Sequence, residues 1–225
     1  MSEKKANKEK RQPKTTPKLR VELSEEQKKL VDLFYKHDVV FCHGDFGSGK
    51  TLSAVHTALT YFNKRQCENI WITRPMLANQ LAALPGTLEE KMSPYTFPII
   101  QNLEVCQGKE KTDKMLKDGT VKIMPIEVAK GVTFMESVVI VDEYQDMTYQ
   151  DFRTILTRLG DGSKMIFCGS VQQIDHKIGD RSCIHSTMKL KESGLVGYIT
   201  LKGNHRNPIL TEIINFLEKD LEYKE

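Results

Sequence analysis

The chain has 225 residues, of which 39% are hydrophobic and 28% charged, and its formal net charge is +3. This composition is typical of one soluble globular domain and excludes fibrous and low-complexity classes. No apolar run reaches the roughly 18 residues of a membrane span, and the lysine-rich start lacks the apolar segment of a signal peptide. We therefore expect a cytoplasmic protein with no membrane partner.

The positive charge is concentrated at the N-terminus. Residues 1–20 hold eight Lys or Arg and two Glu, a net +6, so that residues 21–225 carry −3 of the total +3. This segment has two prolines and no aromatic residue. It cannot recover its ordering entropy by burial, and we predict a disordered basic tail, either a basic arm for nucleic acid or simply a solvated terminus. Residues 21–225 are predicted to form one folded domain.

Helical and strand patterns alternate after the tail. Residues 23–37 have apolar residues at helical spacing behind Ser24, a typical N-cap. An apolar strand at 39–43 follows, then a glycine-rich loop, a helical pattern over 50–65 and a strand at 69–73. This part of the chain predicts the order helix, strand, helix, strand.

The second half continues the alternation after an irregular section. Prolines interrupt residues 74–119, where we expect helices joined by loops. Beyond this section, β-branched apolar runs predict strands at 121–126, 137–142, 164–169 and 197–201. Helical patterns lie at 148–160, 182–193 and 208–221. Because the strands are apolar on both faces, we predict an α/β fold whose mostly parallel sheet has helices on both faces.

The cysteines and histidines show no metal-binding pattern. The five cysteines form no C-x-x-C pair, and the six histidines lack ligand spacing. An odd number of cysteines without such pairs argues against a disulfide framework and a zinc site. Cys42 and Cys168 lie in apolar runs, where cysteine behaves as a small core residue. We expect no structural metal.

The stretch GDFGSGKT, residues 44–51, fits the P-loop pattern in full, with a strand before it and a helix after it. Glycine allows positive φ and close approach, so backbone N–H groups can surround phosphate oxygens at a helix N-terminus; the alternative is a glycine-rich turn. Lys50 is expected to reach the β- and γ-phosphates and Thr51 to bind Mg²⁺. The predicted nucleotide-binding residues here are Gly44, Asp45, Phe46, Gly47, Ser48, Gly49, Lys50, Thr51 and Leu52.

The run VVIVDEYQD places Asp142 and Glu143 at the end of an apolar strand, the edge at which α/β sheets bind ligands. Asp142 suits the Mg²⁺ shell, usually through water. Glu143 is placed to polarise an attacking water, which a hydrolase needs and a small-molecule kinase can omit; the alternative is a solvated loop carboxylate. Together with the P-loop, the two acids predict hydrolysis of a nucleoside triphosphate.

Six segments of the chain, taken in order, resemble PhoH-like ATPases, a family related to the first RecA-like domain of superfamily 1 helicases. The segments are GDFGSGKT, WITRPML, LPGTLEEKMSPY, VDEYQD, LTRLGDGSKMIFCGSVQQID and NHRNPILTEII. The resemblance covers about residues 23–219. It implies a single RecA-like P-loop domain that uses ATP and Mg²⁺.

The resemblance also implies roles for individual residues. Gln27 matches the glutamine that reads adenine, with a plain surface glutamine as the alternative. Gln173, or its neighbour Gln172, matches the glutamine that contacts the γ-phosphate or its attacking water. Its strand would lie between the P-loop strand and the strand of the two acids. Ser170 stands where related sequences usually have Asp, which puts a supporting role at this position in doubt.

Arg206 in NHRNP resembles the arginine that stabilises charge on the transferred phosphoryl group. A solvated arginine is the alternative, and the sequence leaves open whether it acts in its own site or a neighbour's. The roughly 170 residues after the P-loop complete one lobe, whereas a translocating helicase closes two lobes on one nucleotide. We therefore expect a homo-oligomer, for example a hexameric ring, with Arg206, Arg153 or Arg158 acting across the interface.

The segment TRPML resembles a helicase motif that holds the backbone of a single strand. Thr73 and Arg74 are the candidate contacts, because hydroxyl and guanidinium groups donate to phosphate oxygens. In the alternative, Arg74 pairs with a carboxylate at the core edge or lies at a subunit contact. Single-stranded RNA or DNA is the expected partner. Strand cleavage would need another protein, so a separate nuclease or helicase is a candidate partner, and the sequence leaves open whether this chain unwinds duplexes.

Two other functions remain open at this point. A thymidine-type nucleoside kinase has a similar P-loop and DE-x-Q motif, but it normally carries zinc-binding C-x-x-C pairs, which this sequence lacks. A nucleotide-dependent assembly module with little turnover is the other alternative. Glu143 argues against such a module, because a switch without hydrolysis has no use for a water-activating carboxylate.

Overall fold

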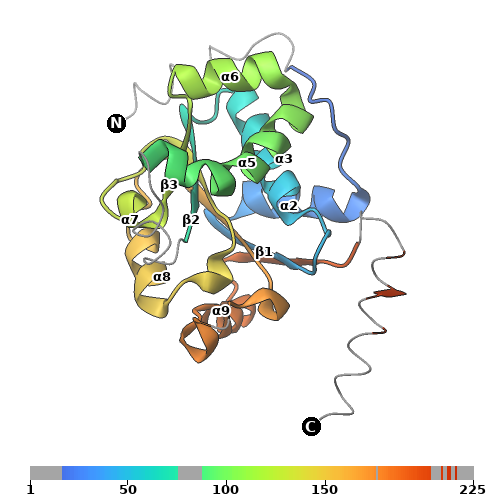
Figure 1. Cartoon of the computed structure of the whole chain (residues 1–225), viewed down its shortest axis with the longest axis vertical. Coiled ribbons are helices and arrows are strands. Elements are labelled where there is room, and N and C mark those ends of the chain that lie inside the picture. The colour runs from blue at the N-terminus through green and yellow to red at the C-terminus, as the bar shows by residue number, and fades with distance from the viewer. Residues whose placement is uncertain are drawn as a thin grey trace.

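The computed structural model describes residues 17–75, 88–175 and 177–203, together with residues 209, 212, 213 and 216. These residues form a six-stranded sheet in the order β3-β2-β4-β5-β1-β6, and every strand pair is parallel. Helices lie on both faces of the sheet (Figure 1). The predicted α/β architecture is confirmed.

The six strands correspond to the six predicted apolar runs, and each end agrees to within one residue. Their bounds are β1 Val39–Gly44, β2 Asn69–Arg74, β3 Val121–Pro125, β4 Ser137–Val141, β5 Lys164–Gly169 and β6 Gly197–Leu201. All residues of β4 are buried, as are all but the first of β1 and β5. A strand that is covered on both faces needs an unbroken apolar run, which is why these segments stand out in the sequence.

The helices follow the prediction less closely. Their bounds are α2 Glu25–Lys36, α3 Lys50–Asn63, α5 Leu88–Gln107, α6 Lys109–Lys117, α7 Ile126–Ala129, α8 Tyr149–Leu156 and α9 Ile184–Met188. Ser24 is the N-cap of α2, as predicted, and Thr148 caps α8. The helix predicted at 182–193 is divided into α9 and the 3₁₀ turn η4 Lys189–Glu192. The helix predicted at 208–221 lies almost entirely outside the described residues.

Helix α5 runs through two prolines that were expected to interrupt helical structure. Pro94 and Pro98 both lie inside it. An interior proline costs about 3 kcal/mol because it removes one backbone hydrogen bond and crowds the preceding turn. Ile99, Leu103 and Cys106 of the same helix are almost completely buried, and each such apolar side chain contributes roughly 1.5–3 kcal/mol. The burial of these apolar side chains therefore outweighs the tendency of the two prolines to interrupt the helix.

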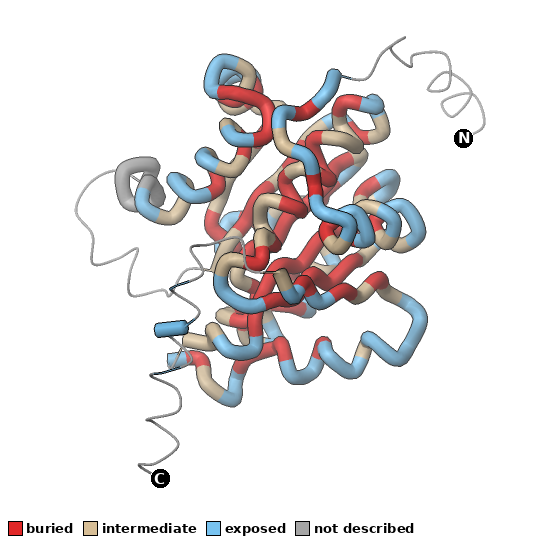
Figure 2. The backbone as a smooth tube through the Cα atoms, turned by 90° about the vertical axis from the view of Figure 1, so that its right-hand side faces the viewer, coloured by how far each residue is buried: buried red, intermediate tan, exposed pale blue. Residues whose placement is uncertain are grey.

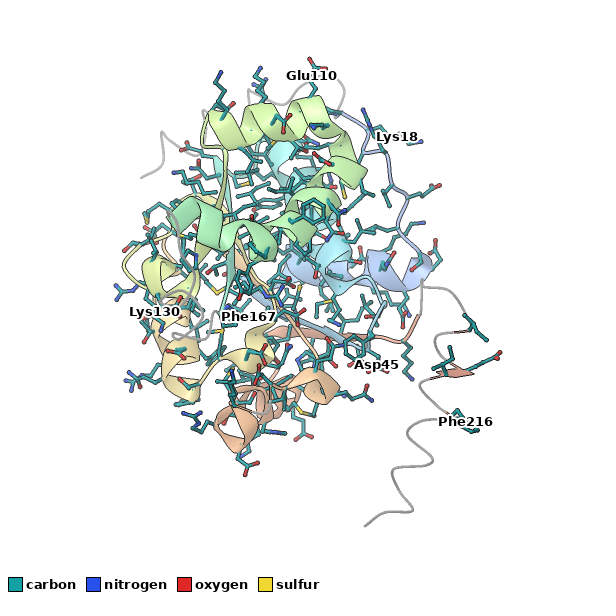
Figure 3. All side chains as sticks on the ribbon, viewed as in Figure 1. Lys18, Asp45, Glu110, Lys130, Phe167 and Phe216 are labelled. Carbon is teal, nitrogen blue, oxygen red and sulfur yellow. The ribbon has the colours of Figure 1, made fainter. Side chains whose placement is uncertain are left out.

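Two apolar clusters, one on each face of the sheet, form the core. The first joins the sheet to α2, α3, α5 and α6, and the second joins it to α7, α8 and α9. Figure 2 shows the buried backbone concentrated in the middle of the molecule, and Figure 3 shows Phe167 of β5 in the interior. Cys42 and Cys168 are fully buried register partners on β1 and β5, which confirms their predicted place in the core.

Part of the segment predicted as the basic tail contacts the folded domain. Leu19 is buried in the first cluster, and the Arg20 N–H donates to the Cys106 carbonyl at 2.8 Å. Leu19 and Arg20 therefore pack against the domain although they fall within the range 1–20 predicted as a tail, while residues 1–16 lie outside the described part. Among the described residues, no helix has the length and apolar character needed to cross a bilayer.

Candidate active site

Strand order brings the predicted site residues to one edge of the sheet. Strand β5 lies between β4 and β1, as predicted, so the segments that follow these three strands meet at their carboxyl ends. These segments are the loop after Gly44, the 3₁₀ turn η1 Tyr144–Asp146 and the 3₁₀ turn η2 Val171–Gln173. In parallel sheets this is the edge at which ligands bind, where the strand order leaves a crevice.

The glycine loop connects β1 directly to α3. Gly47 and Gly49 have φ values of 75° and 79°, in the left-handed region that glycine tolerates best. Gly49 is the N-cap of α3 and makes no side-chain cap hydrogen bond, so the first turn presents its N–H groups to the loop. The Ser48 hydroxyl donates to the Asp45 carbonyl at 2.9 Å and braces the loop from inside. Such an arrangement of N–H groups at a helix N-terminus suits an anion.

Lys50 extends its side chain across the loop. Its ammonium donates to the carbonyls of Gly44 at 2.7 Å and Asp45 at 3.1 Å, and the residue is only 9% exposed. These contacts hold a buried positive charge inside the loop, next to the N–H groups. An anionic group entering the loop would therefore meet a positioned cation.

Asp142 and Thr51 face each other at the base of the loop. The Thr51 hydroxyl donates to Asp142 Oδ1 at 2.8 Å, and Asp142 is buried. Burial, followed by the charge of Glu143, raises the pKa of Asp142 to about 6, against the opposing effects of Arg74, Thr51 and Lys50. A cation bound nearby would stabilise the ionised form of this buried carboxylate.

Glu143 has an unusual backbone and two side-chain contacts. Its φ of 53° is in the left-handed region, which a glutamate rarely adopts. Gln145 Nε2 donates to Glu143 Oε2 at 2.7 Å, and Arg74 Nη2 lies 3.9 Å from Glu143 Oε1. The tight turn after β4 thus directs the carboxylate toward the loop edge of the sheet.

Some of these residues line one cavity of about 390 Å³, whereas the buried Asp142 lies behind Thr51 and is not part of its lining. The cavity is lined by Phe46, Gly47, Gly49, Lys50, Thr51, Leu52, Asn102, Glu143 and Gln173. Gln173 Nε2 is buried and has no hydrogen-bond partner among the described residues. A buried amide donor without a partner is costly in itself, and at the wall of a cavity it is available to an acceptor on a ligand.

Several predicted residues are not among those that line this cavity. Gln27 is buried, and its Oε1 accepts from the Ser24 N–H in the capping box of α2, so the structure places it in the helix cap. Thr73 is 1% exposed, and its hydroxyl has no hydrogen-bond partner among the described residues. Arg74 pairs with Glu143, as in the alternative interpretation of this residue. Arg206 lies outside the described residues.

The sequence prediction missed two residues of this region. Asn102 reaches the cavity from α5, and no local pattern marks it because only the packing of α5 on α3 brings it there. Gln145 accepts from the Ser170 N–H at 3.2 Å and donates to the Gln173 carbonyl at 3.4 Å as well as to Glu143. Its place two residues after Glu143 in DEYQD was the available signal. Gln145 contacts the backbone N–H of Ser170, so this contact does not depend on whether position 170 carries Ser or Asp.

Gly169, the last residue of β5, is required by the close approach of η1. A Cβ at this position would lie 2.6 Å from Tyr144 Cδ1 and 2.7 Å from Gln145 Oε1. We expect Gly169→Ala to lower the stability by about 1–3 kcal/mol and to lower turnover, because Gln145 would be displaced from Glu143. Urea unfolding and steady-state kinetics measure both effects.

Gly131→Ala is the matched control for this substitution. Its added Cβ would come no closer than 3.5 Å to the Val128 carbonyl, which is an ordinary contact. We expect its stability and turnover to stay near those of the wild type. Equal behaviour of the two variants would contradict the close packing at Gly169.

His43, next to the glycine loop, is buried and belongs to a chain of hydrogen bonds in which each group donates to the next. The Thr187 hydroxyl donates to the Ile184 carbonyl, so it accepts from Tyr144. The Tyr144 hydroxyl then accepts from His43 Nε2, and the Tyr198 hydroxyl donates to His43 Nδ1 at 2.8 Å. This assignment requires a neutral imidazole protonated at Nε2. The chain ties β1 to the turn that carries Glu143.

This network makes the stability sensitive to acid. Burial, and then the charges of Lys50 and Lys191, lower the pKa of His43 to about 4, from an ordinary value of about 6.5. As the pH falls, the imidazole of the unfolded chain is protonated before the buried one. The contribution of neutral His43 to the free energy of unfolding is therefore fully present above about pH 6.5 and is lost as the pH falls toward 4, and its full size is roughly 3 kcal/mol. We expect urea unfolding of His43→Gln to show a smaller loss between pH 7 and pH 4.5 than the wild type.

His185→Gln is the control for this experiment, because His185 is exposed. This variant should reproduce the wild-type pH dependence. If His43→Gln does so as well, His43 does not contribute the acid-sensitive part of the stability.

Comparison with known proteins identifies a family at this point. The family model described as PhoH-like protein matches residues 21–218. A PhoH-like protein of Bacillus subtilis (strain 168) is 33% identical over 199 residues, which cover 86% of this chain and 62% of the relative. One of Synechocystis sp. (strain PCC 6803) is 31% identical over 198 residues, 86% of this chain and 60% of the relative. The chain thus spans about 60% of the length of these relatives.

A solved structure supports the fold assignment. The UvsW helicase from bacteriophage T4 aligns with a TM-score of 0.50 at 14% identity, covering 88% of this chain and 67% of the helicase chain. At this identity the similarity concerns the fold alone. It agrees with the α/β sheet described above.

Proposed function

Since the chain belongs to the PhoH-like family, we propose that it is a Mg²⁺-dependent ATPase whose turnover is coupled to a single strand of RNA or DNA. The site is the cavity between the glycine loop and the ends of β4 and β5. The proposal rests on one observation: Lys50, Thr51, Glu143 and Gln173 all line this cavity. Their groups supply a cation, an oxygen ligand, a carboxylate and an unsatisfied amide donor.

The residues at the base of the loop fit a magnesium ion. The Thr51 hydroxyl and the Asp142 carboxylate are oxygen donors that already lie 2.8 Å apart, and Mg²⁺ is typically held by one or two such groups together with phosphates and water. Thr51 and Asp142 would hold the ion, Asp142 through water. When bound, the ion neutralises negative charge on the β- and γ-phosphates.

The remaining groups divide the chemistry among them. The N–H groups of residues 44–51 bind the phosphates, and Lys50 places its charge against them. Glu143 accepts a proton from the attacking water, and the Gln173 amide donates to that water or to the γ-phosphate. Glu143 lines the cavity, which favours hydrolysis over transfer to a nucleoside and over an assembly module with little turnover.

Four further parts of the proposal rest on the family resemblance rather than on the cavity. Arg206 stabilises charge on the transferred group, and Arg153, which is exposed, or Arg158 could take this role across an interface. A homo-oligomer such as a hexameric ring would supply the second surface of the site. Gln27 contacts adenine only if its capping contact with Ser24 opens. A separate nuclease or helicase would act on the strand.

The test is ATP hydrolysis by the purified chain, with and without single-stranded RNA and DNA, at 50 and 200 mM salt. We expect release of ADP and inorganic phosphate, stimulated by a strand, with stimulation that falls at the higher salt because the contacts are to phosphates. Phosphorylation of thymidine by the chain would favour the kinase. Binding of ATP without turnover in either condition would favour the assembly module.

A further inference from the structure

Arg74 ends β2 beside the two site acids. The Thr73 carbonyl accepts from the Asp142 N–H at 2.8 Å, so the residue after Thr73 lies level with the turn after β4. Arg74 Nη2 is 3.9 Å from Glu143 Oε1, and the positive charge of Arg74 also lowers the pKa of Asp142 and of Asp146 against the effect of burial. Three carboxylates therefore attract this guanidinium toward the site.

The Glu143 carboxylate is held on both of its oxygens, but the two contacts differ in strength. Gln145, on Oε2, is 1% exposed, and its other hydrogen bonds, to the backbone of Ser170 and Gln173, fix it in place. Arg74, on Oε1, makes a long ion pair whose side chains are 30% and 25% exposed. The contact with Gln145 is part of the fold, whereas the contact with Arg74 can be broken at little cost.

We propose that Arg74 is a releasable restraint on Glu143: it holds the carboxylate in a resting position, and a phosphate of a single strand that binds Arg74 releases it. This inference rests on the proposed function, because it describes the regulation of the same site. Arg74 then acts as a positioning residue that couples strand binding to water activation, in addition to being a strand contact.

The chemistry of the guanidinium supports the exchange. A phosphodiester oxygen pair can accept two parallel N–H bonds from arginine, and such bidentate contacts are shorter and stronger than a single ion pair at 3.9 Å. Part of the Arg74 side chain is exposed, so a strand can reach it. Thr73 is buried, which leaves Arg74 as the accessible member of the predicted pair of strand contacts.

The expected size of the effect follows from the strength of exposed ion pairs. Such pairs contribute about 0.2–1 kcal/mol, which corresponds to a change in rate of up to about fivefold. We expect Arg74→Ala to raise kcat without nucleic acid about two- to fivefold and to reduce the stimulation by poly(U) or poly(dT) to less than about twofold. Assays at saturating ATP and Mg²⁺ compare turnover rather than nucleotide binding.

Three further variants make the test specific. Arg74→Lys restores the charge beside Glu143 but not the planar fork, so its basal kcat should return to within about twofold of the wild type while stimulation stays weak. Arg74→Ala combined with Glu143→Gln should be as inactive as Glu143→Gln alone, because the released carboxylate is what acts. Arg65→Asn removes an exposed charge at the far end of α3, roughly 20 Å from the loop, and suits a left-handed residue. It should change neither quantity.

The outcomes separate the two proposals. If the wild type hydrolyses ATP and the basal kcat of Arg74→Ala is equal to or below the wild-type value, the restraint is overturned and the proposed function stands. Stimulation of Arg74→Ala at the wild-type level also overturns it. If the wild type does not hydrolyse ATP, the proposed function fails, and the restraint fails with it.

Discussion

Lys50→Ala is expected to reduce ATP turnover by about 10²–10³-fold and to weaken ATP binding. The loss corresponds to about 2.7–4 kcal/mol, the usual effect of removing one preorganised group that faces developing charge. Lys50 is suited to this role because its ammonium is buried inside the glycine loop, held by the Gly44 and Asp45 carbonyls. Steady-state kinetics give kcat and KM, and calorimetry gives the Kd for ATP.

Lys109→Ala is a matched control, since Lys109 is an exposed lysine at the start of α6. It should have wild-type turnover and binding. Thermal unfolding of both variants shows whether the fold is intact. Wild-type turnover by Lys50→Ala would exclude the glycine loop as the site where the reacting phosphate binds.

Glu143→Gln is expected to reduce turnover by about 10²–10⁴-fold while ATP still binds. The substitution removes the proton acceptor but keeps the shape, and a glutamine carbonyl can still accept from Gln145 Nε2. The loop from Gly44 to Thr51 and the Lys50 contacts are untouched, so the Kd for ATP should stay within about threefold of the wild-type value. Single-turnover kinetics and calorimetry separate the two quantities.

Glu110→Gln, on the exposed first turn of α6, is the control that removes a carboxylate elsewhere. It should not affect turnover. A Glu143→Gln variant that hydrolyses ATP at the wild-type rate would show that another group activates the water. Comparison with Lys50→Ala then distinguishes loss of phosphate binding from loss of chemistry.

The sequence was sufficient wherever a single contiguous segment carries the physical signal. Each strand is covered on both faces and therefore needs an unbroken apolar run, so all six were predicted to within one residue. The glycine loop was recognisable because left-handed backbone at Gly47 and Gly49 demands glycine within a few residues of Lys50. The two acids could be recognised as well, because they come immediately after the apolar run of β4.

Features that arise from contacts between segments far apart in the chain could not be predicted from local sequence patterns. Helix α5 passes through Pro94 and Pro98 because its apolar residues pack on the sheet, and the same packing brings Asn102 to the cavity. Gly169 must lack a side chain because the turn that contains Tyr144 and Gln145, 25 and 24 positions earlier in the chain, packs against it.

The sequence by itself therefore determined the strands, the glycine loop and the position of the two acids at the end of a strand, because these features are local patterns of burial and backbone conformation. Only the tertiary structure decided how the acids are held. Arg74 is separated from Glu143 by 69 positions in the chain, and it is the adjacency of β2 and β4 that brings the guanidinium to the carboxylate. Pairing across a sheet depends on strand order, which short sequence patterns do not specify.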